Sequence, residues 1–104
     1  MIGRALPTVA CVAAATFVSS APALAADVMA GASLYRRHCA NCHGDNGRPV
    51  MPTAPDFSRP PALLKPDLLL AASIRTGRGA MPGYDGQLRE REILDIVAHM
   101  RTFR

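Results

Sequence analysis

Aromatic residues, strand-like patterns and catalytic groupings are all scarce in this sequence, and each scarcity narrows the class of protein. Aromatic residues are 5% of the chain, and the 12 Lys and Arg residues, against 8 Asp and Glu, are spread along it without a nucleic-acid-binding motif. We therefore expect no nucleic-acid partner, and the net charge of +4 suits at most weak steering towards an acidic partner. No stretch alternates apolar and polar residues as a strand does, so the expected fold class is all-α. No grouping of acid, base and nucleophile indicates a substrate pocket, so we do not expect an enzyme.

The start of the chain has the composition of an export signal. Met1–Arg4 is short and basic, Ala5–Ser20 is almost wholly apolar or small, and Ala23-Leu24-Ala25 ends the segment with an Ala-x-Ala pattern. This order predicts a cleaved secretory signal peptide over residues 1–25. Residues 26–104 are enough for one small domain, which we expect in the periplasm.

An uncleaved membrane anchor is the alternative interpretation of this segment. Ala5–Ala26 is about as long as the roughly 20 residues that a bilayer-spanning helix needs. Pro7, the Ala-rich composition and the terminal Ala-x-Ala pattern favour cleavage. After cleavage no membrane span is expected.

Cys39 and Cys42 are the only cysteines beyond the predicted signal. A disulfide between them would close a tiny loop and constrain little of the unfolded chain, so we expect another role for the pair. With His43 they form Cys-x-x-Cys-His, the pattern of covalent haem attachment. Two thiols about one helical turn apart can reach the two vinyl groups on one porphyrin edge, and the next residue offers an imidazole to the iron. We therefore predict one haem c, bound through Cys39, Cys42 and His43.

Two other uses of the cysteine pair are weaker. A structural zinc site needs four well-separated ligands, whereas Cys42 and His43 are adjacent and the only other histidines are His38 and His99. A thioredoxin-like dithiol needs a βαβ setting, and no strand is expected here.

Three helices and one long loop make up the expected domain. The helices cover Ala26 to about Cys42, Asp67 to about Thr76 and Leu88 to about Thr102. Between the first two, Gly44–Pro66 is rich in Gly and Pro and must be largely irregular. A loop this long suits so small a domain if it wraps something large and rigid, such as a haem. Gly31 either lets another helix cross close to the backbone or lies in a frayed helix start.

The second axial ligand of the iron is expected to be a methionine, because a thioether opposite His favours the ferrous state. Met29 and Met100 fall in predicted helices and are expected to fill the core. Met51 and Met81 both lie in loops and precede a proline, and chain reach does not exclude either. Met81 is favoured, because it follows an independent helix and lies within the helix-free segment Gly77–Gly83. The remaining alternatives are Met51, His38, His99 and an open site.

These motifs, in this order, resemble a class I cytochrome c of the short bacterial kind found as free periplasmic carriers and as cytochrome subunits or domains of respiratory complexes. The likeness rests on Gly31–Tyr35 leading into Cys39–Gly44, then Gly79–Pro82, then Ile93–Thr102. It implies a small cytochrome c fold in which the first and last helices cross near one haem edge, with Gly31 and Tyr35 at the crossing. It also implies that a backbone carbonyl from Ala54–Phe57 accepts the other ring N–H of His43.

Two positions depart from the pattern of such relatives. Arg89 stands where Ser or Thr often caps the last helix, and Asp85 and Gln87 are the candidate substitutes. His99 stands where an aromatic residue is common. It is expected either in the helix crossing, with some pH sensitivity, or partly exposed without a role.

The expected function is single-electron transfer between a redox donor and a redox acceptor that the sequence does not identify. Arg48, Arg75 and Arg78 either line a docking face or are ordinary solvated residues. The same haem would also serve as a fixed relay subunit of an oxidoreductase complex, so the expected state is a monomer or a subunit. With a labile or absent Met81 bond, it would instead bind or sense a ligand.

Overall fold

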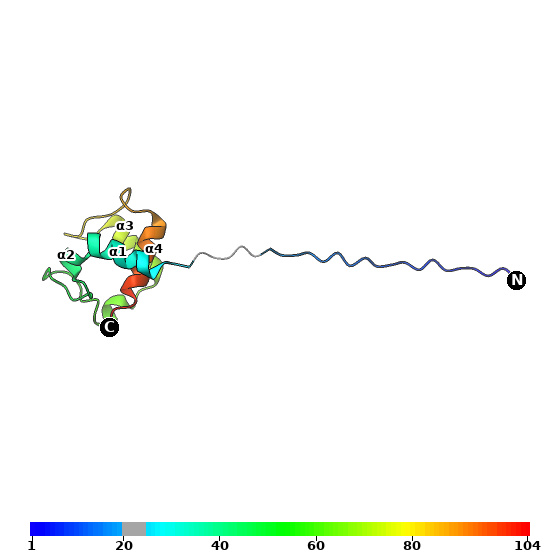
Figure 1. Cartoon of the computed structure of the whole chain (residues 1–104), viewed down its shortest axis with the longest axis horizontal. Coiled ribbons are helices and arrows are strands. Elements are labelled where there is room, and N and C mark those ends of the chain that lie inside the picture. The colour runs from blue at the N-terminus through cyan, green and yellow to red at the C-terminus, as the bar shows by residue number, and fades with distance from the viewer. Residues whose placement is uncertain (20–24) are drawn as a thin grey trace.

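The computed structural model describes residues 1–19 and 25–104. Residues 1–19 have no regular secondary structure and run away from the helical domain (Figure 1). No helix in the described part of the chain has the length and apolar character needed to cross a membrane. Most of the cleavage motif predicted at residues 23–25 lies outside the described residues.

Helices are the only regular secondary structure of the described residues. The elements are α1 (Val28–His38), α2 (Ala40–His43), a short 3-10 helix η1 (Pro60–Leu63), α3 (Asp67–Thr76) and α4 (Glu90–Met100). The all-α prediction is confirmed.

The first predicted helix is in fact two helices, because the chain leaves helical geometry at Cys39. Cys39 has φ −120° and ψ −36° and ends α1, and within α2 the N–H of His43 bonds to the Cys39 carbonyl at 2.9 Å. α1 begins after Asp27, whose carboxylate accepts the backbone N–H groups of Met29 and Ala30, each at 3.0 Å. This is the usual N-cap arrangement of an aspartate. The cysteine pair therefore lies at the junction of the two helices.

α1 and α4 cross in close contact (Figure 1). A Cβ atom on Gly31 would lie 1.8 Å from the backbone oxygen of Asp95, so only glycine fits at this point. One turn further along α1, Tyr35 is fully buried, and its ring centroid lies 5.3 Å from that of His99 and 5.1 Å from that of Phe103. The crossing predicted at Gly31 and Tyr35 is confirmed, and His99 lies within it.

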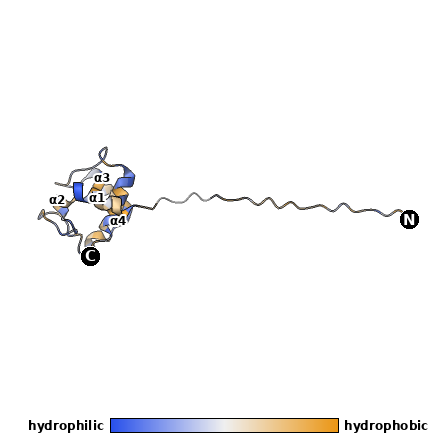
Figure 2. Ribbon diagram, viewed as in Figure 1, coloured by the Kyte–Doolittle hydropathy of each residue, from blue (hydrophilic) through white to orange (hydrophobic). Residues whose placement is uncertain are grey.

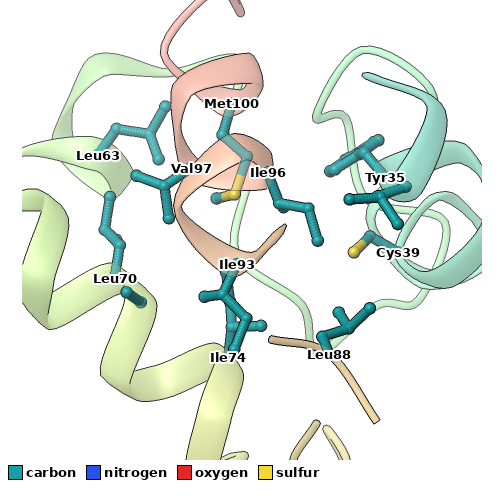
Figure 3. Close-up of a cluster of buried hydrophobic side chains, with 12 residues drawn as sticks. Tyr35, Cys39, Leu63, Leu70, Ile74, Leu88, Ile93, Ile96, Val97 and Met100 are labelled. Atoms are coloured by element: carbon teal, nitrogen blue, oxygen red, sulfur yellow. The ribbon is translucent and has the colours of Figure 1, made fainter. Parts of the chain in front are cut away.

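The hydrophobic core is made mainly by side chains from α1, α3 and α4, with Cys39, Leu63 and Leu88 added from outside these helices (Figure 3). Figure 2 shows α3 and the middle of α4 as hydrophobic, whereas the end of α1 and the start of α4 are hydrophilic. The largest fully buried side chains are Tyr35, Ile93, Ile96 and Val97. Burial of each aliphatic side chain among them stabilises the fold by about 1.5 to 3 kcal/mol.

The helix boundaries around the last loop agree with the prediction in part. α3 spans its predicted residues and stops at Gly77, whose φ of 77° is accessible to glycine at little cost. α4 begins at Glu90 rather than at Leu88, and the carboxylate of Glu92 accepts the backbone N–H of Arg89 at 3.0 Å. Neither Asp85 nor Gln87 provides a side-chain cap among the described residues, so that expectation is wrong.

The long loop between α2 and α3 is irregular, as predicted, apart from η1. Backbone bonds fasten its first half: the N–H groups of Val50 and Met51 bond to the Cys42 carbonyl at 2.9 and 3.0 Å, and the N–H of Phe57 bonds to the Gly47 carbonyl at 2.9 Å. The loop is therefore attached directly to α2, which carries the cysteine motif.

Candidate functional site: a cofactor cavity

A cavity of about 840 Å³ opens between the long loop and the helices. Its wall is formed by the end of α1 and α2, by residues of the 51–65 loop, by α3, by the 78–84 segment and by Met100 of α4. This volume lies within the range of about 300 to 1,000 Å³ that is usual for cofactor and ligand sites. The domain therefore has room for one cofactor among largely apolar side chains.

Cys39, Cys42 and His43 all line this cavity. Neither cysteine forms a disulfide, and Cys39 is buried whereas Cys42 is exposed. Burial, with a smaller contribution from Cys42, raises the pKa of the Cys39 thiol to about 11. The thiol is therefore protonated at neutral pH, which keeps a charge out of an apolar wall.

The imidazole of His43 is buried beside Phe57. The two rings stack with centroids 4.9 Å apart and planes inclined by 23°. Burial lowers the pKa of His43, which favours the neutral ring that a metal requires. Its Nδ1 atom is buried and has no hydrogen-bond partner within the described chain.

The hydrogen bond expected from a carbonyl of Ala54–Phe57 to His43 is therefore absent among the described residues, although most of this stretch does line the cavity. The backbone bond from Phe57 to Gly47 holds this part of the loop. It places the ring of Phe57, rather than a loop carbonyl, against the imidazole.

Met81 lies on a tightly held turn that also lines the cavity. Arg78 and Met81 exchange two backbone hydrogen bonds, of 3.1 and 2.9 Å. A Cβ on Gly77 would lie 2.6 Å from the Met81 carbonyl oxygen, and one on Gly83 would lie 2.8 Å from the Arg75 carbonyl oxygen. The two glycines let this turn pack directly on the end of α3.

The other candidate ligands are distributed unevenly around the cavity. Met51, Met100 and His38 line it as well, whereas His99 does not line it and packs on Tyr35. A second, small cavity of about 20 Å³ is lined by both His43 and Met81, but not by Met51. Met100 is buried in the core as expected, but Met29 is 78% exposed, so its prediction as a core residue was wrong.

Tyr84 is a site residue that the sequence did not reveal. Its hydroxyl donates to the backbone carbonyl of His38 at 2.8 Å, and it lines the cavity. The acceptor is a main-chain oxygen 46 residues away, so no local pattern points to this contact.

The three candidate docking arginines differ in their surroundings. Arg75 is held by Glu90 through bonds of 3.0 and 2.7 Å, so its charge is already paired. Arg78 is exposed and lines the cavity, whereas Arg48 is exposed but does not line it. Only Arg78 combines a cavity position with a charge that has no ion-pair partner among the described side chains.

The helical fold and this site together define a c-type cytochrome. The cavity is large enough for a haem, two free cysteines on one wall suit thioether bonds, and a buried, neutral imidazole and a thioether suit iron.

Residues 26–100 match the family described as "Cytochrome C oxidase, cbb3-type, subunit III", to which the chain belongs. It is 31% identical to a cytochrome c6 of Picosynechococcus, with 86% of this chain and 84% of that protein covered. It is 34% identical to a cytochrome c6 of Thermostichus vulcanus, over 89% of this chain and 86% of that one. The solved structure of the KustC0563 c-type cytochrome superposes with a TM-score of 0.67 at 26% identity, covering 71% of this chain and 96% of that chain.

The chain is accordingly a class I c-type cytochrome with one covalently attached haem c and its iron. It is an electron carrier that exchanges electrons with redox partners, and it is not an enzyme.

Proposed function

We propose that this chain is an exported, periplasmic electron carrier, in which Cys39 and Cys42 attach the haem while His43 and Met81 hold the iron. One observation carries the assignment of residues: all four side chains line one cavity of about 840 Å³, and of the two loop methionines only Met81 also lines the small cavity that His43 lines. When bound, the haem supplies an iron that cycles between the ferric and ferrous states and so carries one electron. Within this proposal, residues 1–25 are the cleaved signal peptide and residues 26–104 are the working domain.

The second axial ligand is tested by comparing two methionine variants. Ferric haem with a Met ligand has a weak long-wavelength charge-transfer band. We expect the band in the wild-type protein and in Met51→Ala, and its loss in Met81→Ala. Loss of the band in Met51→Ala alone would assign the ligand to Met51, and its absence from the wild type would overturn Met ligation altogether.

Cysteine attachment and export are tested on the secreted protein. Its mass is expected to equal residues 26–104 plus one haem, and its reduced haemochrome spectrum to show two thioether bonds. A mass that includes residues 1–25 would contradict cleavage. A spectrum with one thioether bond would contradict the role of one cysteine.

Arg78 is the residue proposed to guide an acidic redox partner to the cavity mouth. Arg78 is exposed and lines the cavity, so its charge is accessible to a protein that docks over the cavity. We expect Arg78→Gln to slow electron exchange with an acidic partner protein at low ionic strength and to reduce its salt dependence. Arg48→Gln is the matched control. An equal effect of both variants would indicate general charge attraction rather than a docking role.

A fixed relay subunit of an oxidoreductase complex is the second candidate, and the family match to an oxidase subunit favours it. The two candidates separate on native purification in mild detergent. A carrier elutes alone, whereas a subunit elutes with other polypeptides in constant ratio.

A further inference from the structure

Asp95 of α4 is a buried acidic residue that the proposed haem site does not use. Its side chain and backbone together are 4% exposed. The burial follows from the helix crossing, because the Asp95 backbone oxygen packs on Gly31 and brings α1 close against this turn of α4. Its Oδ1 atom accepts the backbone N–H of Asp27 at 2.7 Å. Asp95 thus joins α4 to the residue that caps α1.

Two acidic residues lie at this junction, and among the described residues no cationic side chain is paired with either of them. Asp27 uses its carboxylate to cap α1. The four ion pairs of the described residues have other acids as their anions, namely Asp56, Asp67, Glu90 and Glu92. Residues 20–24 contain no charged side chain in the sequence. The N-terminal dipole of α1 offsets part of this negative charge, but a buried carboxylate next to another acid still favours a nearby cation.

Removal of the leader creates a cation at this place. Water adds across the peptide bond between Ala25 and Ala26, the C–N bond breaks, and the leader departs with the new carboxylate of Ala25. Ala26 then carries an α-ammonium group in place of an amide. Its nitrogen is three bonds from the Asp27 nitrogen that Asp95 already binds, so the two backbone nitrogens are less than about 4 Å apart.

We propose that the α-ammonium of Ala26 pairs with the carboxylate of Asp95. Cleavage of the signal peptide would thereby add an ion pair between the start of α1 and α4. This inference rests on the proposed export and on cleavage after Ala25. It makes the mature protein more stable than the precursor through a charge that the precursor lacks. Asp95 is then the acceptor for the new amino terminus.

The pairing has a signature in the pH dependence of stability. An α-amino group has an ordinary pKa of about 7.7 to 8.0, and pairing with a carboxylate raises it in the folded state. The stabilisation is therefore fully present below about pH 7.7 and is lost as the pH rises through the folded-state pKa.

The other ionisable groups at the junction do not produce the same signature. They are Asp27 on α1 and, within one turn of Asp95 on α4, Arg91, Glu92 and His99. Carboxylates and guanidinium groups do not titrate between pH 7 and 10. Burial, with Arg36, lowers the pKa of His99 and so moves it away from this range.

The test uses the secreted holoprotein, with its start at Ala26 checked by mass, and urea unfolding from pH 6 to 10. Asp95→Asn keeps an acceptor for the Asp27 N–H but removes the charge. A second variant keeps Asp95 and adds two alanines before Ala26, which moves the ammonium away. We expect each to raise the unfolding equilibrium constant at pH 7 roughly fivefold to tenfold and to lose the decline in stability above pH 8. Asp85→Asn, an exposed acid, is the matched control and is expected to behave as the wild type.

Each outcome tests the proposed pairing of Ala26 with Asp95 independently of the proposed haem site. A wild-type stability profile that is flat from pH 7 to 10 would overturn it, and so would an extended variant that matches the wild type. A secreted protein that retains the leader would overturn it too, and the mass would show this directly. Because all variants keep the proposed haem ligands, an unchanged haemochrome spectrum leaves the carrier function standing in every case.

Discussion

The hydroxyl of Tyr84 donates a hydrogen bond to the backbone carbonyl of His38 over 2.8 Å, and the His38 and Tyr84 rings meet edge to face with centroids 5.7 Å apart. His38 ends α1 immediately before Cys39, and Tyr84 lies three residues after Met81. One side-chain contact therefore joins the segment that holds the cysteine motif to the segment that holds the proposed axial methionine.

Tyr84→Phe is expected to loosen the Met81 segment while leaving the fold intact. The variant keeps the ring but loses one exposed hydrogen bond, which costs about 0.5 to 1.5 kcal/mol of stability. If Met81 holds the iron, as proposed, a looser Met81 segment lets an outside ligand compete for that position. We expect faster carbon monoxide binding to the reduced protein, measured by stopped flow.

Tyr35→Phe is the matched control for Tyr84→Phe. It also removes a hydroxyl bonded to a backbone carbonyl, that of Gly44 at 2.7 Å, but this bond is buried and lies on another segment. We expect it to cost more stability, about 1 to 3 kcal/mol, without faster carbon monoxide binding. Equal acceleration in the two variants would show that general loosening, rather than the Tyr84 contact, controls access.

Local patterns were sufficient to predict α3 and, within two residues at each end, α4, whereas the crossing of α1 with α4 was expected from the resemblance to class I cytochromes c. Apolar residues at spacings of three and four mark α4, and Gly77 marks the end of α3. The cost of a glycine inside a helix left two interpretations of Gly31 open, a close helix crossing and a frayed helix start, and only the resemblance placed it at the crossing. The kink at Cys39 could not be predicted, since nothing in its neighbours breaks a helix.

The sequence alone singles out Cys39, Cys42 and His43, because covalent attachment sets their spacing, and the structure places all three on the wall of one cavity. The contacts around this motif could not be predicted from the sequence, because they depend on how segments that are far apart in the chain pack together. Phe57 stacks on His43 because a backbone bond to Gly47 folds the loop back, and Tyr84 reaches His38 across 46 residues. No local sequence pattern predicts the contact of Phe57 with His43 or that of Tyr84 with His38.

Gly31→Ala is expected to destabilise the protein despite the better helix propensity of alanine. The new Cβ would lie 1.8 Å from the Asp95 oxygen, which is backbone and cannot rotate away. The helices must separate, and because the obstructing atom is backbone the cost is near the upper end of the about 1 to 3 kcal/mol typical of overpacking, which exceeds a propensity gain of about 1 kcal/mol. Urea unfolding of the holoprotein measures the difference.

Ser33→Ala serves as the control for Gly31→Ala, because Ser33 lies on the exposed face of the same helix. We expect its stability to equal or slightly exceed that of the wild type. A stabilised Gly31→Ala variant would show that α1 and α4 do not meet at this point.

His99 is expected to make the protein less stable as the pH falls below neutral. Burial, followed by the charge of Arg36, lowers the pKa of His99 below its ordinary value of 6.5. The unfolded chain then binds a proton more readily than the folded one, so the stabilisation is complete above pH 6.5 and is lost as the pH falls through the folded-state pKa. His99→Tyr, measured by urea unfolding from pH 8 to 5, should show a shallower decline.

Arg36→Gln separates the two causes of the lowered pKa of His99, which are burial and the charge of Arg36. Removing the guanidinium leaves the burial in place, so we expect a decline that is smaller than in the wild type but larger than in His99→Tyr. If His99→Tyr keeps the full wild-type decline, other groups carry the acid sensitivity.

Arg101 fastens the end of the long loop to the end of α4. Its guanidinium donates to the Asp67 carboxylate at 2.9 Å and to the backbone carbonyls of Leu63 and Lys65. These acceptors run from the last residue of η1 to the first residue of α3, and one of them, Lys65, lines the cavity. Arg101→Ala is expected to cost about 1 to 2 kcal/mol of stability and to speed hydrogen exchange in residues 63–67.

Arg101→Lys tests whether the loop is held by the positive charge of Arg101 or by the several N–H donors of its planar guanidinium group. Lysine can still pair with Asp67, but a single ammonium cannot reach three acceptors in the same geometry. We therefore expect partial recovery of stability with little recovery of slow exchange in residues 63–67. Full recovery of both would mean that the ion pair alone holds the loop. Arg91 is an exposed arginine of α4 that forms no ion pair among the described residues, so Arg91→Ala should leave both measurements unchanged.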